Sequence, residues 1–159
     1  MEITENMKLE MKNVLSFRGS LTQKSLNEKI KEMEKLVKEF GAHALHPPIT
    51  TSFGADKTAK EPSIDIEILV PLDKDVSHEV LVKALPGYRF KPVFTLTHAV
   101  KLHHVGNTPL EDSIKELYSY LKVRDLDPLT TLYSITMSTP DKPDETFTDL
   151  MVGINPNKL

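Results

Sequence analysis

The chain has 159 residues, no cysteine and a formal net charge of −3 at pH 7. This length fits one domain or two closely joined half-domains, the missing cysteine excludes disulfides and zinc–thiolate sites, and the acidic balance gives no reason to expect nucleic acid. Residues 1–13 lack the apolar segment of a signal peptide, and no apolar run approaches the roughly 20 residues of a membrane span, so we expect a cytoplasmic protein that does not bind membranes.

The first predicted elements are a strand at residues 14–20 and a helix behind it. Ser20 and Gln23 have the spacing of a capping box, which predicts that the helix begins at Ser20. Apolar residues at steps of three or four indicate its buried face: Leu26, Ile30, Met33, Val37 and Phe40. Gly41 is the predicted left-handed stop.

A second strand is predicted at residues 63–70, because apolar and polar side chains alternate there. One face carries Ile64, Ile66, Ile68 and Val70, and the other carries Asp65, Glu67 and Leu69. We expect the isoleucine row to pack against the helix and the mixed row to face a ligand. Residues 77–85 predict one or two helical turns. Residues 88–97 look extended, and Pro92 suits an edge strand or a bulge.

The second half of the chain repeats this order, with a strand at residues 101–106 that ends in glycine and a second helix. Thr108 is its predicted cap and Pro109 its first helical residue. The predicted buried face of this helix consists of Leu110, Ile114, Leu117 and Leu121. Residues 140–145 predict a turn between the last two strands.

Those last two strands are predicted at residues 130–137 and 149–154. In the first, the row expected against the helix is Tyr133, Ile135 and Met137, which leaves Leu132, Ser134 and Thr136 on the mixed row. In the second, the helix row is Leu150, Val152 and Ile154, and the mixed row is Asp149, Met151 and Gly153. A register shift by one residue would exchange Ser134 for Tyr133 or Ile135.

The repeated order of elements predicts an α+β fold for a single domain over residues 1–159. Its two pseudo-symmetric halves span about residues 12–71 and 88–155, and each is a β-α-β-β unit. Together they are expected to form a curved antiparallel sheet with two main helices on one face. The mixed rows would then meet in a central cleft suited to a small molecule.

Several features together resemble the GyrI-like small-molecule-binding domain, which is also the effector-binding domain of AraC- and MerR-type transcription regulators. They are the duplicated order of elements, His104-Val105-Gly106 before the second helix, the strand between Pro128 and Pro140, and the closing Thr148-Asp149-Leu150-Met151-Val152. The resemblance covers about residues 12–155. It implies two SHS2-like units whose cleft takes up small, often cationic or aromatic compounds. Because only about 13 residues precede the first strand, we expect a stand-alone form without its own DNA-binding module.

Members of that family commonly carry a pocket glutamate on the strand after the second helix, with a tyrosine two residues later. The matching positions in this chain hold Ser134 and Thr136. A buried carboxylate attracts a cation because an unpaired charge is costly in a low dielectric, whereas a serine offers only a neutral hydrogen bond. Glu67, on the matching strand of the first half, is the candidate that could supply the charge. The alternative is that Glu67 is solvated or paired with a nearby lysine.

The predicted ligand-binding residues are Glu67, Leu69, Leu132, Ser134, Thr136, Met151 and Tyr118. For Tyr118 the alternative is core packing. No catalytic residue, metal site or cofactor is predicted, because His103 and His104 would point to opposite faces of a strand and because His43 and His46 have no acidic neighbour in their loop.

The leading functional hypothesis is non-catalytic binding of a small organic ligand, aromatic or cationic, of the effector or drug-like kind. The alternatives are a protein-interaction module of the gyrase-inhibitor type and a small-molecule hydrolase. Hydrolysis is disfavoured because a serine without a neighbouring base does not readily activate water or form an acyl-enzyme.

Overall fold

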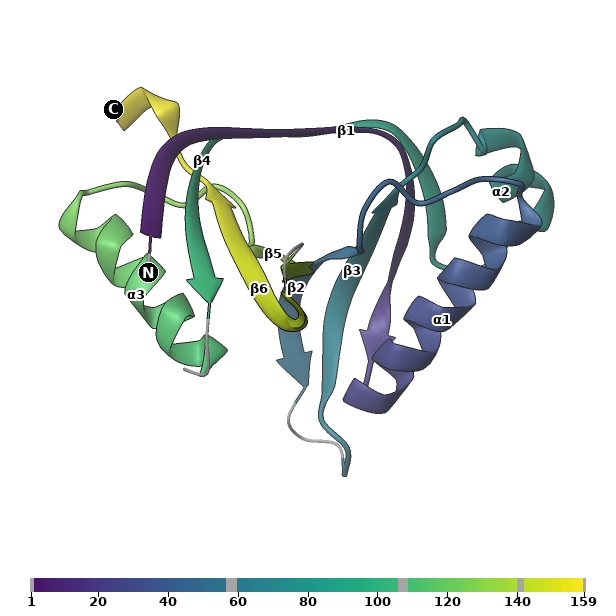
Figure 1. The fold of residues 1–159 in the computed structure, drawn as a ribbon, viewed down its shortest axis with the longest axis horizontal. Coiled ribbons are helices and arrows are strands. Elements are labelled where there is room, and N and C mark those ends of the chain that lie inside the picture. Colours follow the sequence, from purple (N-terminus) through teal and green to yellow (C-terminus); the bar gives the residue numbers. More distant parts are fainter. Residues whose placement is uncertain (1, 57–59, 106–108, 140–141, 159) are drawn as a thin grey trace. The chain divides into compact units, whose positions relative to one another are not determined.

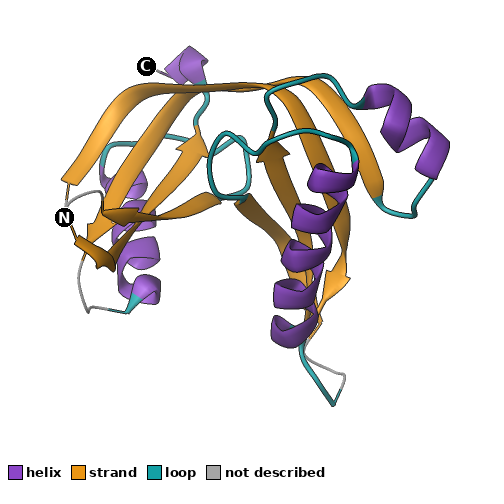
Figure 2. Ribbon diagram, turned by 45° about the vertical axis from the view of Figure 1, so that its right-hand side comes forward, coloured by secondary structure: helices purple, strands orange, loops and turns teal. Residues whose placement is uncertain are grey.

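The computed structural model describes residues 2–56, 60–105, 109–139 and 142–158. The predicted α+β class is confirmed, with helices and strands both present (Figure 2). The strand pairs β1–β3, β2–β3, β4–β6 and β5–β6 are antiparallel. The strands are β1 (Glu2–Leu21), β2 (Ile49–Asp56), β3 (Ser63–Pro71), β4 (Tyr88–Val105), β5 (Tyr133–Thr139) and β6 (Lys142–Gly153). The helices are α1 (Gln23–Glu39), α2 (Ser77–Lys83) and α3 (Leu110–Val123), with a short 3-10 turn at Pro156–Lys158.

The chain divides into two compact units. Residues 10–94 form one, here named the contiguous unit; residues 1–9 and 95–159 form the other, here named the split unit. The predicted division into pseudo-symmetric halves at 12–71 and 88–155 stays a prediction. In the described part of the chain, no helix is long and apolar enough to cross a membrane.

In the contiguous unit, β3 lies between β1 and β2, and α1 runs along this sheet (Figure 1). Ile68 and Val70 of β3 belong to one buried cluster with Met33 and Val37 of α1. The predicted isoleucine row therefore faces the helix, as the alternation indicated. The helical turns expected at residues 77–85 are α2, and residues 88–97 are the extended first part of β4.

Helix α1 begins two residues later than predicted. Thr22 is its N-cap: Thr22 Oγ1 accepts the Ser25 N–H at 3.2 Å, and Ser25 Oγ accepts the Thr22 N–H at 2.7 Å. Ser20 remains in β1, paired with Asp65 of β3, so sheet pairing takes precedence over the capping box expected there. Gly41 has φ +69°, which confirms the predicted left-handed stop.

In the split unit, β6 lies between β5 and β4, and Leu117 and Leu121 of α3 are buried against this sheet. The expectation for Leu110 is wrong, because its side chain at the start of α3 is 38% exposed. Pro109 is the N-cap residue rather than the first helical residue. Thr108, Gly106 and Pro140 lie outside the described residues. Residues 142–145, predicted as part of a turn, belong to β6, which begins at Lys142.

The predicted faces are right for β6 and wrong for β5. Leu150 of β6 lies in the α3 core, and its register partner is Ser134. Directly opposed residues share a face of an antiparallel sheet, so Ser134 is on the helix side. Tyr133 pairs with Met151 and is on the other side. Tyr133 and Ile135 are nevertheless buried, which explains why hydrophobicity assigned them to the helix face.

Candidate ligand-binding site

The sheet face of the contiguous unit opposite α1 carries a cavity of about 290 Å³. Its lining residues are Ser16, Arg18, Glu67, Gly87, Arg89 and Lys91. Strand alternation brings these side chains together. Arg18 and Glu67 are register partners on β1 and β3. Tyr88 and Phe90 of β4 pack against the α1 core, so the intervening Arg89 and the following Lys91 point to the opposite side.

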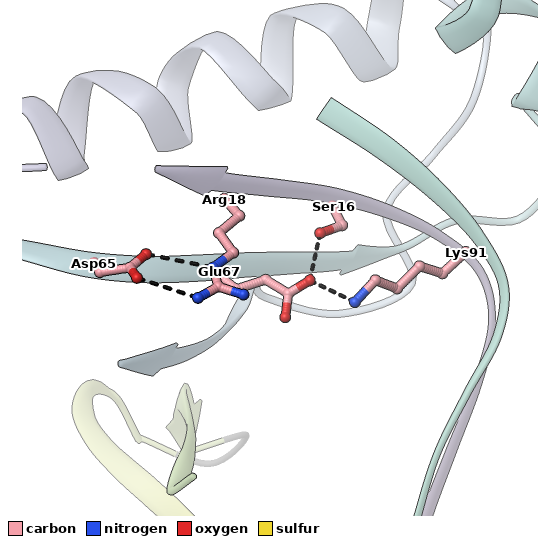
Figure 3. Close-up of polar contacts among 5 residues, drawn as sticks. All are labelled: Ser16, Arg18, Asp65, Glu67 and Lys91. Carbon is pink, nitrogen blue, oxygen red and sulfur yellow. Dashed lines mark hydrogen bonds and ion pairs between the residues drawn. The ribbon is translucent and has the colours of Figure 1, made fainter. Parts of the chain in front are cut away.

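Glu67 is the buried acid of this cavity, with 7% of its surface exposed. Its Oε2 atom accepts a hydrogen bond from Ser16 Oγ at 2.7 Å and lies 2.5 Å from Lys91 Nζ (Figure 3). The Lys91 side chain is 33% exposed, so the pair lies at the boundary between the sheet and the cavity. The alternation predicted the face of Glu67, and the lysine pairing considered for it is present.

Arg18 is held on the same face by a carboxylate and an aromatic ring. Its Nη2 and Nε atoms donate to Asp65 at 3.1 and 3.4 Å, and its guanidinium carbon lies 3.8 Å from the centre of the Phe53 ring. The hydrogen bond to Asp65 raises the pKa of Arg18 above its ordinary value. Arg18 is therefore a fixed positive charge in one wall of the cavity.

Gly87 lets the segment before β4 approach this wall. Its carbonyl accepts the Arg18 N–H at 3.0 Å, and its φ is +81°. A Cβ atom at Gly87 would lie 2.8 Å from the Arg18 carbonyl oxygen, which is closer than real contacts allow. Of the lining residues only Glu67 was among the predicted ligand-binding residues; the prediction did not include Ser16, Arg18, Gly87, Arg89 and Lys91. The alternation of aromatic and basic residues over 88–91 was the signal that could have identified the last two.

The other predicted site residues do not line this cavity. Leu69 shares the Glu67 face but is completely buried beside Ser16, its register partner. Tyr118 is 40% exposed on α3, so the core-packing alternative for it is wrong.

Ser134 and Met151 were predicted on the mixed rows of their two strands, both facing away from the helix. The register of β5 and β6 places them on opposite faces of the sheet. Leu132 packs against the α3 core. Thr136 Oγ1 is hydrogen-bonded to Thr148 Oγ1 at 2.9 Å.

Histidine side chains form two pairs in the split unit. His103 Nδ1 lies 2.6 Å from Asp149 Oδ1, and the His103 ring contacts the Phe147 ring in a tilted arrangement, with 4.8 Å between the ring centres. His104, on the opposite face, has its Nδ1 atom 2.5 Å from Ser113 Oγ in a buried setting. Within the described ranges, no group of three or more histidine and acidic side chains is placed to hold a metal ion.

Neither a protein-family model nor a curated protein matches the sequence significantly. Solved structures do match. A chain of the EcmrR–DNA complex solved by cryo-EM matches with a TM-score of 0.69 and 17% identity, over 97% of this chain and 56% of that one. The crystal structure of the EcmrR C-terminal domain matches with a TM-score of 0.65 and 14% identity, over 98% of this chain and 99% of that one. The present chain thus spans little more than half of the longer EcmrR chain.

SAV2435 bound to tetraphenylphosphonium matches at a TM-score of 0.48 and 9% identity, over 99% of this chain and 94% of that one, which is too low to carry that ligand over to the present chain. The two EcmrR structures show the fold. The chain has the fold of the EcmrR C-terminal domain, and its resemblance to the GyrI-like domain is confirmed at the level of the fold.

Proposed function

We propose that the protein binds a small organic ligand, without chemical conversion, in the cavity on the Glu67 face of the contiguous unit. The observation that carries this proposal is the convergence of fixed charged groups on one cavity: Glu67 buried on β3, Arg18 on β1, and Lys91 on β4. Small-molecule sites combine a concave surface with a few convergent polar groups. The fixed geometry of Arg18 and Glu67 lowers the entropy cost of binding.

The resemblance to the GyrI-like small-molecule-binding domain also supports the proposal, and the chain has the fold of the EcmrR C-terminal domain. The SHS2-like duplication, a central cleft, the stand-alone form and a cytoplasmic location remain predictions. For the protein-interaction and hydrolase alternatives, no specific observation in the described residues provides support.

A compound panel tests the proposal. The purified protein is screened by thermal shift with cationic, neutral and anionic aromatic compounds, and each hit is titrated by calorimetry. We expect saturable binding of about one ligand per chain, weakened by Glu67→Gln because that substitution removes the carboxylate that positions Lys91.

The matched control is Asp149→Asn, which removes a paired carboxylate in the split unit and should leave binding unchanged. A panel without any saturable ligand, or hits equally affected by both substitutions, would contradict a site at Glu67.

A further inference from the structure

Basic side chains outnumber acidic side chains around the Glu67 cavity. Among the described residues that line the cavity, Arg18, Arg89 and Lys91 are basic and only Glu67 is acidic. Cations remain in excess even when Asp65, the partner of Arg18, is included. We propose that the ligand carries an anionic group, a carboxylate, sulfonate or phosphate, bound by Arg89 and Lys91. This inference rests on the proposed function and specifies the chemistry of its ligand.

The charge of Glu67 is already balanced. Its Oε2 atom receives both the Ser16 hydroxyl and the Lys91 ammonium. A buried carboxylate attracts a cationic ligand strongly only while it is unpaired. In this chain a cationic ligand would have to displace an ammonium group that is covalently attached to β4. Lys91 therefore opposes cation binding at Glu67.

Because Lys91 is paired with Glu67, the positive charge left to bind a ligand comes from Arg89. Among the described residues it has no ion-pair or hydrogen-bond partner, and the alternation along β4 places it on the same face as Lys91, two residues away. A guanidinium group binds carboxylates and phosphates through two parallel hydrogen bonds. Arg18 lies on β1, where Asp65 and Phe53 hold its guanidinium group, and it adds positive potential to the cavity.

Three compounds with one ring system test the charge preference on the full chain: 2-naphthoate, neutral 2-naphthamide and cationic 2-naphthylmethylammonium. We expect naphthoate to bind about tenfold more tightly than the amide, as a charge-assisted bond to an arginine supports. Its affinity should fall as salt is raised.

Arg89→Gln should reduce naphthoate affinity about fivefold or more, and the exposed position of Arg89 makes a folding defect unexpected. Lys91→Met should reduce naphthoate binding and also increase binding of the cationic compound, because it leaves Glu67 without its ammonium partner. Lys115→Met, at an exposed position on α3, is the control and should change neither affinity.

Tighter binding of the cation to the unmodified protein, lost in Glu67→Gln, would overturn the anion inference and leave the proposed function intact. Naphthoate binding that neither Arg89→Gln nor Lys91→Met weakens would overturn the inference too, because the anion would then bind elsewhere. If none of the three compounds and no member of the wider panel bound saturably, both the inference and the proposed function would be overturned.

Discussion

Glu67 and Lys91 form an ion pair whose two members differ in burial: the Glu67 side chain is 9% exposed and that of Lys91 33%. The difference matters because a buried charge that loses its partner keeps its desolvation cost, while an exposed charge regains water. The two members of the pair therefore contribute unequally to stability when each is replaced alone.

Lys91→Met should lower the free energy of unfolding by about 1–3 kcal/mol, because it leaves the Glu67 carboxylate buried with only Ser16 as a donor. Glu67→Gln should cost less, since the Lys91 ammonium can turn toward solvent. The double variant should be more stable than the sum of the two losses predicts. Urea unfolding of the four proteins measures this coupling, and strictly additive losses would contradict the pairing.

Tyr88 has a buried hydroxyl with no hydrogen-bond partner in the part of the chain that the structure describes. Burial raises its pKa well above the ordinary value of 10.0. A raised folded-state pKa means that stability is complete below about pH 10 and is lost as the pH rises above it, because the unfolded chain releases the proton first.

Tyr88→Phe removes that unpaired hydroxyl and keeps the ring, which packs on Phe17. We expect the free energy of unfolding to rise by about 1 kcal/mol at pH 7, because an unsatisfied buried polar group is removed. The advantage of the variant should grow above about pH 10. Urea unfolding at pH 7 and pH 10.5 measures both effects, and a destabilised variant would show that the hydroxyl has a partner in solution.

Among the secondary-structure elements, helix α1 owes part of its stability to the hydrogen bonds of its first turn. The reciprocal hydrogen bonds between Thr22 and Ser25 satisfy backbone N–H groups that otherwise have no partner within the helix. Thr22→Ala should lower the free energy of unfolding by about 1 kcal/mol, the usual cost of losing an N-cap side chain. Thr22→Ser keeps the acceptor oxygen and should be nearly neutral in the same urea titration. Equal losses in both variants would mean that the methyl group, rather than the cap, stabilises this turn.

Strand faces were predictable where one row is apolar and the other carries charged side chains, and they were not predictable where neither row carries a charge. The alternation in β3 correctly separated Ile68 from Glu67, because one row packs on α1 and the other carries charge. In β5 both rows carry buried or half-buried residues, and Tyr133 and Ile135 are buried away from α3. Hydrophobicity alone cannot decide the face of such a strand.

The site was predictable only in part for a related reason. Glu67 could be identified because an acidic residue interrupts an apolar strand. Its partner Lys91 lies 24 positions away, on β4, which follows β3 after helix α2. Only the tertiary arrangement brings these two side chains together. Local patterns therefore found the charge but did not identify which lysine pairs with it, and the expectation of a cationic ligand came from the family resemblance.

At the scale of the whole molecule, two buried clusters of described residues share strands. One cluster joins α1 to the sheet of the contiguous unit, and the other joins α3 to the sheet of the split unit. β1 and β4 contribute residues to both units as uninterrupted strands. Because β1 and β4 continue from one unit into the other, unfolding of either unit removes part of the pairing of these two strands. This favours a single cooperative unfolding transition.

Leu117→Ala tests this cooperativity. Leu117 is fully buried in the α3 cluster, so the substitution should lower the free energy of unfolding by about 2–5 kcal/mol. Native-state hydrogen exchange then measures the protection of backbone amides in β6 of the split unit and in β3 of the contiguous unit. We expect protection to fall by the same free energy in both strands, because the shared strands couple their opening. Val123→Ala, at an 85% exposed position on the same helix, should leave both unchanged. A loss confined to β6 would show that the two units unfold independently despite the strands they share.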